Sequence, residues 1–175
     1  NYNFNMVAID DQRPMRVGLK HILTSYLAFQ KQVVRRRTQF NLQKAQHRLH
    51  IVEGLIKALS ILDQVIKTIR ASKNRKDAKQ NLVDQYQFTE EQAEAIVTLQ
   101  LYRLTNTDVT ELRDEQAKLN KQIDEFQLIL NDDHELATVL RKEMRAIKKE
   151  FGNPRGTKIE DQVEKLEVDT KVTVA

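Results

Sequence analysis

The sequence predicts a mainly α-helical protein, in which a long antiparallel coiled-coil hairpin carries a small helical dimerisation head and short β elements lie at the termini. Only 4 Gly and 2 Pro occur in 175 residues, so few positions force a helix to end. Charged residues make up 31% and aromatic residues 6%, which is typical of long solvated helices. Seven positions between 109 and 130 follow a 3-4-3-4 spacing, and all but one are apolar, as expected where one helix packs along another. They are Val109, Leu112, Gln116, Leu119, Ile123, Phe126 and Leu130.

Residues 1–18 predict a β-hairpin at the edge of a preceding, tower-like domain. Residues 4–9 alternate in side-chain character, 10–13 form a turn, and 14–17 return as a second short strand. The sequence does not begin with Met and has no basic segment followed by a signal-like apolar core. We therefore expect the chain to be part of a longer protein.

Residues 19–72 predict the outgoing helix, either as one long helix or as two helices end to end. Residues 19–71 contain no Pro and a single glycine, Gly54. Glycine costs about 1 kcal/mol against alanine inside a helix. Gly54 allows a bend, permits a close helix approach, or is simply tolerated. The partner seam for the downstream heptads is predicted at Val52, Leu55, Leu59, Leu62, Ile66 and Ile69.

Residues 73–107 predict the helical head. A short helix over about 76–85 is followed by a capping box from Thr89 to Gln92, which starts a helix reaching about Leu104. That helix is apolar on nearly all sides and must be enclosed. A head of about 35 residues is too small to cover it, so we expect a second copy to do so across a two-fold dimer contact. The predicted contact residues are Ile96, Leu99, Leu101, Tyr102 and Leu104.

Residues 108–152 predict the returning coiled-coil helix and a final helix. Asp132 and Asp133 cap the final helix, which covers about residues 134–151, and Gly152 to Pro154 end it. Residues 153–175 are predicted to form a tail or a return strand, because valines alternate loosely there.

No catalytic or metal-binding constellation occurs in the chain. His47 and His50 are neighbours on a helix, but no third ligand accompanies them, and a solvated or DNA-facing position explains them better. The chain has no cysteine, which excludes disulfides and thiolate metal sites and fits a cytoplasmic protein. No apolar run approaches the roughly 20 residues of a membrane span, so no membrane anchor is predicted.

Positive charge is concentrated in one stretch of the sequence. Residues 12–52 contain nine Lys or Arg and no Asp or Glu, whereas the remainder is mildly acidic. Such a block favours a polyanion, most commonly nucleic acid, and the partner predicted here is duplex DNA. A solvated helix face is the competing interpretation, and the sequence leaves the two nearly even. The residues predicted to face DNA are Lys31, Arg35, Arg36, Arg37, Lys44 and Arg48.

Several sequence strings resemble the A subunits of bacterial type IIA DNA topoisomerases. They are residues 33–40 (VVRRRTQF), 50–55 (HIVEGL) and 151–155 (FGNPR). Residues 54–60 (GLIKALS) and 99–108 (LQLYRLTNTD) are more similar to topoisomerase IV A subunits of Gram-positive bacteria than to gyrase A subunits. The resemblance covers nearly the whole chain.

The resemblance implies that this region is the coiled-coil arm and the C-terminal exit gate, where two copies meet and a transported duplex leaves during ATP-dependent strand passage, decatenation and relaxation. It implies that the chain works with a B subunit in an A2B2 enzyme, in which that B subunit binds Mg and ATP. It places the catalytic tyrosine in an upstream domain and the enzyme in the bacterial cytoplasm, at the nucleoid. This chain would then hold no catalytic residue and no cofactor. The alternative is a coiled-coil dimerisation or adaptor module without DNA transport.

Overall fold

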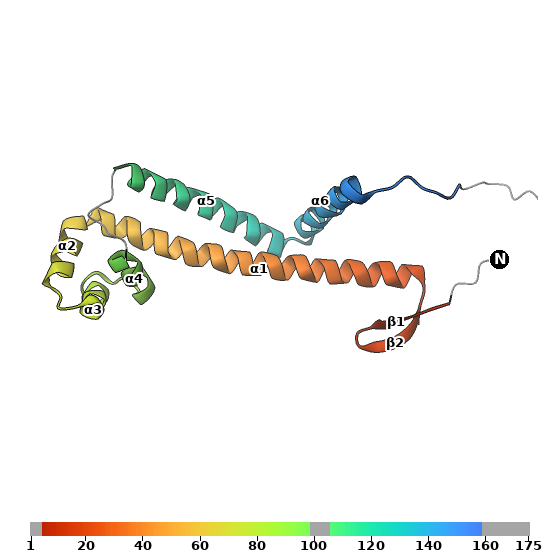
Figure 1. The fold of residues 1–175 in the computed structure, drawn as a ribbon, viewed down its shortest axis with the longest axis horizontal. Coiled ribbons are helices and arrows are strands. Elements are labelled where there is room, and N and C mark those ends of the chain that lie inside the picture. Colours follow the sequence, from red (N-terminus) through yellow and green to blue (C-terminus); the bar gives the residue numbers. More distant parts are fainter. Residues whose placement is uncertain (1–4, 99–105, 159–175) are drawn as a thin grey trace, which may run out of the picture.

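The protein is an elongated helical arm with a compact helical head at one end (Figure 1). The computed structural model describes residues 5–98 and 106–158. Its mainly α-helical, antiparallel two-helix architecture confirms the predicted fold class. The predicted C-terminal strand lies largely outside the described residues. The elements are β1 (Met6–Asp10), β2 (Arg13–Val17), α1 (Leu19–Ser60), α2 (Leu62–Ala71), α3 (Arg75–Tyr86), α4 (Glu90–Thr98), α5 (Asn106–Asn131) and α6 (Asp133–Phe151).

The N-terminal hairpin forms as predicted. Strands β1 and β2 are antiparallel, and Asp10 pairs with Arg13 at the turn. The two residues between them, Asp11 and Gln12, both have positive φ, at 47° and 63°. A two-residue turn of this kind matches the right-handed twist of the strands that it joins. Asp10 also connects the hairpin to α1, because its Oδ2 accepts a hydrogen bond from the hydroxyl of Ser25 at 3.1 Å.

The arm is formed by α1 and α5, which run antiparallel along much of their length (Figure 1). With 42 residues, α1 is roughly 63 Å long at the usual rise per residue. The core of the arm is a cluster of buried residues from both helices, Ala45 and Val52 from α1 and Leu119 and Ile123 from α5. Half-buried residues extend it, namely Leu42, Leu49, Ile56, Leu112 and Phe126.

The structure divides the predicted seam residues between the arm and the head. In α5, Leu112, Leu119, Ile123 and Phe126 belong to the arm core, whereas the half-buried Val109, Gln116 and Leu130 lie outside it. Of the seam residues predicted in α1, only Val52 belongs to the arm core. The row that faces α5 runs through residues 42, 45, 49, 52 and 56 instead. The remaining upstream residues pack in the head, as Leu55, Leu59, Leu62 and Ile69 do, or are half-buried outside any cluster, as Ile66 is.

The outgoing stretch consists of two helices, which settles the choice that the sequence left open. Ile61 interrupts them, with φ −122° and ψ 33°, although neither Gly nor Pro is nearby. Beyond Ile61, α2 turns away from the arm (Figure 1). Its Val65 is fully buried among head residues. By packing, α2 therefore belongs with α3 and α4 in the head, although the sequence-based division placed it in the outgoing helix.

The head has a core of its own, closed on one side by the end of α1. Leu82 of α3, Phe88 of the following loop, and Ala93 and Ile96 of α4 are buried together with Val65. Two residues of α1 complete this core, Leu55 and Ala58.

The final helix, α6, returns towards the hairpin end of α1 (Figure 1). Asp132 caps it as predicted, because its Oδ1 accepts a hydrogen bond from the amide of His134 at 2.8 Å. Leu136 and Leu140 then pack against Val34 of α1. No helix in the described ranges is long and apolar enough to cross a membrane.

Candidate functional site

The N-terminus of α4 lies against the side of α1. Thr89 and Gln92 form the predicted capping box: the amide of Gln92 donates to Thr89 Oγ1 at 3.3 Å, and the amide of Thr89 donates to Gln92 Oε1 at 3.2 Å. His50 Nε2 lies 2.8 Å from the same threonine hydroxyl. The start of α4 is therefore bonded both to itself and to the arm.

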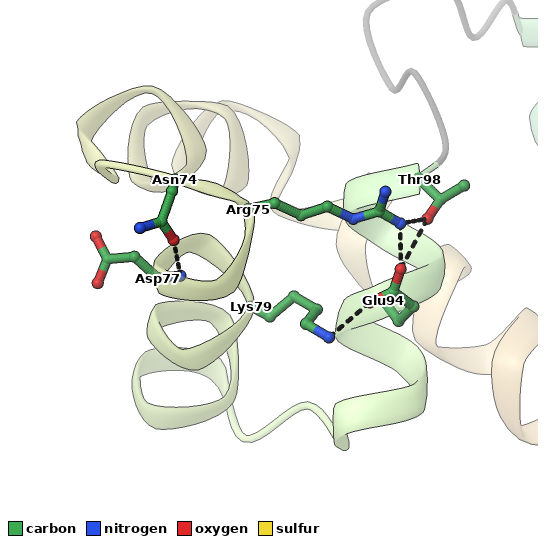
Figure 2. Close-up of polar contacts among 6 residues, drawn as sticks. All are labelled: Asn74, Arg75, Asp77, Lys79, Glu94 and Thr98. Carbon is green, nitrogen blue, oxygen red and sulfur yellow. Dashed lines mark hydrogen bonds and ion pairs between the residues drawn. The ribbon is translucent and has the colours of Figure 1, made fainter.

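Glu94 connects α4 to α3 (Figure 2). Lys79 Nζ lies 2.6 Å from Glu94 Oε2, and Arg75 Nη2 donates to Glu94 Oε1. Arg75 also donates to Thr98 Oγ1 at 2.7 Å. Asn74 caps α3 by accepting the amide hydrogen of Asp77 at 2.8 Å. Arg75 and Lys79 are four residues apart on α3, so both reach one carboxylate. The hydrogen bond from Lys79 is the main cause of the lowered pKa of Glu94, and Arg75 adds to it against the opposing effect of burial.

The structure corrects the prediction that Ile96 takes part in a dimer contact. Ile96 and Ala93 are both 0% exposed within a single chain, because α1, α2 and α3 cover them. The described part of α4 therefore does not need a second copy to hide its apolar side. The other predicted contact residues lie outside the described residues, namely Leu99, Leu101, Tyr102 and Leu104.

Three of the residues predicted to face DNA are paired within the chain. Arg35 Nη2 lies 2.8 Å from Asp133 Oδ1, and Arg37 pairs with Glu143. Arg48 pairs with Glu115 of α5. The acidic partners lie 67 to 106 positions away in the sequence, so the absence of acids within residues 12–52 gave no sign of them.

The other three predicted DNA-facing residues, Lys31, Arg36 and Lys44, are exposed on α1. They make no ion pair with any residue in the described ranges. Their positive charges therefore have no carboxylate beside them, whereas Arg35, Arg37 and Arg48 each lie next to one.

The described residues include no group of three or more His, Cys, Asp or Glu that could hold a metal ion. His47 Nδ1 lies 3.4 Å from Glu91 Oε2, and His50 contacts Thr89, so both histidines face the start of α4. Both histidine contacts connect α1 to the start of α4.

The described residues form a helical arm that carries a separate helical head. Residues 1–145 match the family model for the A subunit of DNA gyrase/topoisomerase IV, and the chain belongs to this family. It is 53% identical over its whole length to the A subunit of DNA topoisomerase 4 from Streptococcus pneumoniae serotype 4. It is 52% identical over 99% of its length to the same protein of Bacillus subtilis strain 168, and 53% to that of Staphylococcus aureus strain NCTC 8325.

The chain spans only about a fifth of the length of these relatives, 21% of the Streptococcus protein and 22% of the other two. The similarity confirms the resemblance drawn from the short strings. Among the relatives compared, it also favours topoisomerase IV, the assignment that residues 54–60 and 99–108 predicted.

Proposed function

We propose that this region is the exit gate of a type IIA topoisomerase A subunit, through which a transported DNA duplex leaves. The observation that carries the proposal is the position of the head. It folds at the far end of a two-helix arm, opposite both the hairpin and the end of α6 (Figure 1). The hairpin and the end of α6 lie at one end of the arm, and the folded head lies at the other (Figure 1). This arrangement suits a contact that the head makes far from the rest of the protein.

In this proposal, two heads meet through the segment that follows α4. Ile96 takes no part, because its own chain buries it. The contact falls instead to Leu99, Leu101, Tyr102 and Leu104. Two copies that use the same segment satisfy the two-fold geometry of a homodimer. Each apolar side chain buried there would contribute about 1.5–3 kcal/mol before the cost of association.

The DNA contact in this proposal uses the unpaired cations of α1. Lys31, Arg36 and Lys44 carry exposed charge without an acidic partner in the described ranges. Contacts of this kind bind phosphates irrespective of sequence. A partner B subunit, with Mg and ATP bound through it, belongs to the same proposal, as do strand passage, decatenation and a place at the bacterial nucleoid.

The proposal is tested by joining the two heads covalently in the full-length protein in complex with its partner. The chain has no cysteine, so Leu101→Cys in an otherwise cysteine-free protein gives one attachment point in each head. A bifunctional maleimide should link the two copies and stop decatenation, while DNA cleavage continues. The matched control is Lys76→Cys, on the exposed side of α3.

Two results would contradict the exit gate. Cross-linked enzyme that still decatenates at the rate of the unlinked enzyme would show that no duplex leaves between the heads. Loss of cleavage together with decatenation would show that the heads are needed for strand cleavage itself, and would count against a role confined to the exit of the duplex. The adaptor alternative predicts the first result.

A further inference from the structure

Helices α1 and α4 approach each other so closely that only glycine fits at position 54. A Cβ atom added at Gly54 would lie 2.6 Å from Cγ of Gln92 and 2.7 Å from its Cδ. Both distances are far shorter than a van der Waals contact between carbon atoms. The backbone of Gly54 is buried, and the stem of Gln92 lies directly over it. Of the three interpretations that the sequence left open, the structure selects a close helix approach.

Gln92 bonds to both helices through one side chain. Its Oε1 accepts from the amide of Thr89 at 3.2 Å, which caps α4. Its Nε2 donates to the backbone carbonyl of His50 in α1 at 2.8 Å. The ring of His50 adds a second link, because its Nε2 lies 2.8 Å from Thr89 Oγ1. We call His50, Gly54, Thr89 and Gln92 the arm–head joint.

The same helix is held on another side by the Glu94 contacts to α3 (Figure 2). These two sets of bonds hold α4 on two sides. In the sequence, α4 leads directly into residues 99–104, where the proposed dimer contact lies. The bonds that orient α4 therefore set the direction of its last residue, Thr98, after which that segment follows in the sequence.

We propose that Gln92 and Gly54 are positioning residues, which fix the orientation of the head on the arm and thereby the direction in which the head presents its dimer contact. The link to the dimer contact rests on the proposed function, whereas the fixed orientation of the head on the arm does not. Gln92 acts through its two hydrogen bonds, and Gly54 acts by leaving room for the Gln92 stem.

The first experiment asks whether Gly54→Ala stabilises or destabilises the chain. In a helix, Gly→Ala ordinarily stabilises, because alanine has the higher helix propensity. At position 54 the added Cβ meets Gln92, so Gly54→Ala should lower the thermal midpoint of the 175-residue chain. The Cβ of Gln92 also lies 2.9 Å from that position, so the same substitution should raise the thermal midpoint in a Gln92→Gly background, which removes the whole Gln92 side chain. An increase in both backgrounds would overturn the close approach.

The second experiment measures the orientation of the head. Spin labels at Gln43→Cys on α1 and Lys76→Cys on α3 occupy exposed sites in a chain that has no other cysteine. Dilution with unlabelled chain suppresses distances between copies. Pulsed electron resonance should give a narrow distance distribution for the parent and a broader one for Gln92→Met, which keeps the stem but loses both hydrogen bonds. Glu90→Ala, at an exposed site of the same helix, should leave the distribution narrow.

An unchanged distribution in Gln92→Met would overturn the proposal. The dimer dissociation constant, measured where circular dichroism shows each variant fully folded, separates positioning from stability. Positioning predicts weaker dimers for Gln92→Met, whereas a merely stabilising role predicts equal affinity, which would overturn the link to the dimer contact. The parent chain could prove to be a monomer while the distance distribution still broadens in Gln92→Met. That result would contradict the exit gate but support the arm–head joint.

Discussion

Arg48 in α1 donates two parallel hydrogen bonds to Glu115 in α5, from Nε to Oε1 over 2.7 Å and from Nη2 to Oε2 over 2.9 Å. Two-point pairing of this kind fixes geometry as well as charge. It lies beside the apolar core of the arm, one turn from Ala45 and Val52. The pair therefore helps to set how α1 and α5 align, and it places a carboxylate beside the Arg48 charge.

This pair predicts a change of stability with pH. The hydrogen bonds from Arg48 are the main cause of the lowered pKa of Glu115, with burial opposing. A lowered pKa stabilises the fold above the unfolded-state value, about 4.3, and the effect is lost as pH falls through the folded-state value. At pH 7, Glu115→Gln should reduce the free energy of unfolding by roughly 0.2–1 kcal/mol, the range for such exposed pairs.

Urea unfolding of wild type and Glu115→Gln, repeated from neutral to acidic pH, tests this pH dependence. The two curves should converge in acid, because the carboxyl is then protonated in both states of the wild type. Glu125→Gln, at an exposed site of the same helix, serves as control and should stay close to wild type throughout. A gap between wild type and Glu115→Gln that persists unchanged in acid would show that the Arg48 pair is not its cause.

The arm core predicts a contrast between two leucines of α5. Leu119 is 9% exposed, whereas Leu128 is 55% exposed. Leu119→Ala should cost about 2 kcal/mol or more, since it removes buried methyl groups and leaves a cavity. Leu128→Ala should change stability by less than about 0.5 kcal/mol. Chemical denaturation followed by circular dichroism measures both, and equal effects would mean that the helices pack in another register.

The burial of Ile96 predicts an effect on folding. Ile96→Ala should destabilise the chain by about 2–5 kcal/mol, because the side chain is enclosed by three other helices. Thermal unfolding measures the loss, and the midpoint should fall. A midpoint equal to that of wild type would mean that Ile96 is not buried in the single chain and would restore it as a candidate for the dimer contact.

The charge pairing predicts which cations bind DNA. Duplex affinity should be independent of sequence and should fall steeply with salt. Replacing Lys31, Arg36 and Lys44 together by alanine should reduce the slope of log affinity against log salt by roughly 0.9 for each phosphate that the protein no longer neutralises. Replacing Arg35, Arg37 and Arg48 should reduce it less, because carboxylates already balance these charges.

Fluorescence anisotropy with two unrelated duplexes, between low and moderate salt, distinguishes these outcomes. The two triple variants are matched in charge, since each loses three positive charges. Equal slopes for both would contradict the assignment of DNA binding to the unpaired residues. Absence of binding by wild type at low salt would favour the adaptor alternative.

Local pattern was sufficient to predict most of the elements. The spacing of Leu112, Leu119 and Ile123 identified α5, and the capping box at Thr89 and Gln92 identified the start of α4. These features depend on residues within a few turns of one another, so the sequence contains them directly. The hairpin turn at Asp11 and Gln12 is local in the same sense.

Long-range packing explains what the sequence did not reveal. No Gly or Pro marks the break at Ile61 in the sequence. The break lies where the chain leaves the arm and Val65 becomes part of the head core. The seam was extended through Leu59 and Ile66 for the same reason: apolar spacing does not tell which neighbour a residue faces. Similarly, the carboxylate partners of Arg35 and Arg48 come from helices that are distant in the sequence.

The mass of the chain in solution tests the account most directly. Sedimentation equilibrium of the 175-residue chain should give a dimer, at twice the chain mass of 20.5 kDa. Leu99→Asp should give 20.5 kDa, because a charge in the proposed contact opposes association. A wild-type mass of 20.5 kDa at every concentration, or a Leu99→Asp dimer as stable as the wild type, would contradict a gate formed by paired heads.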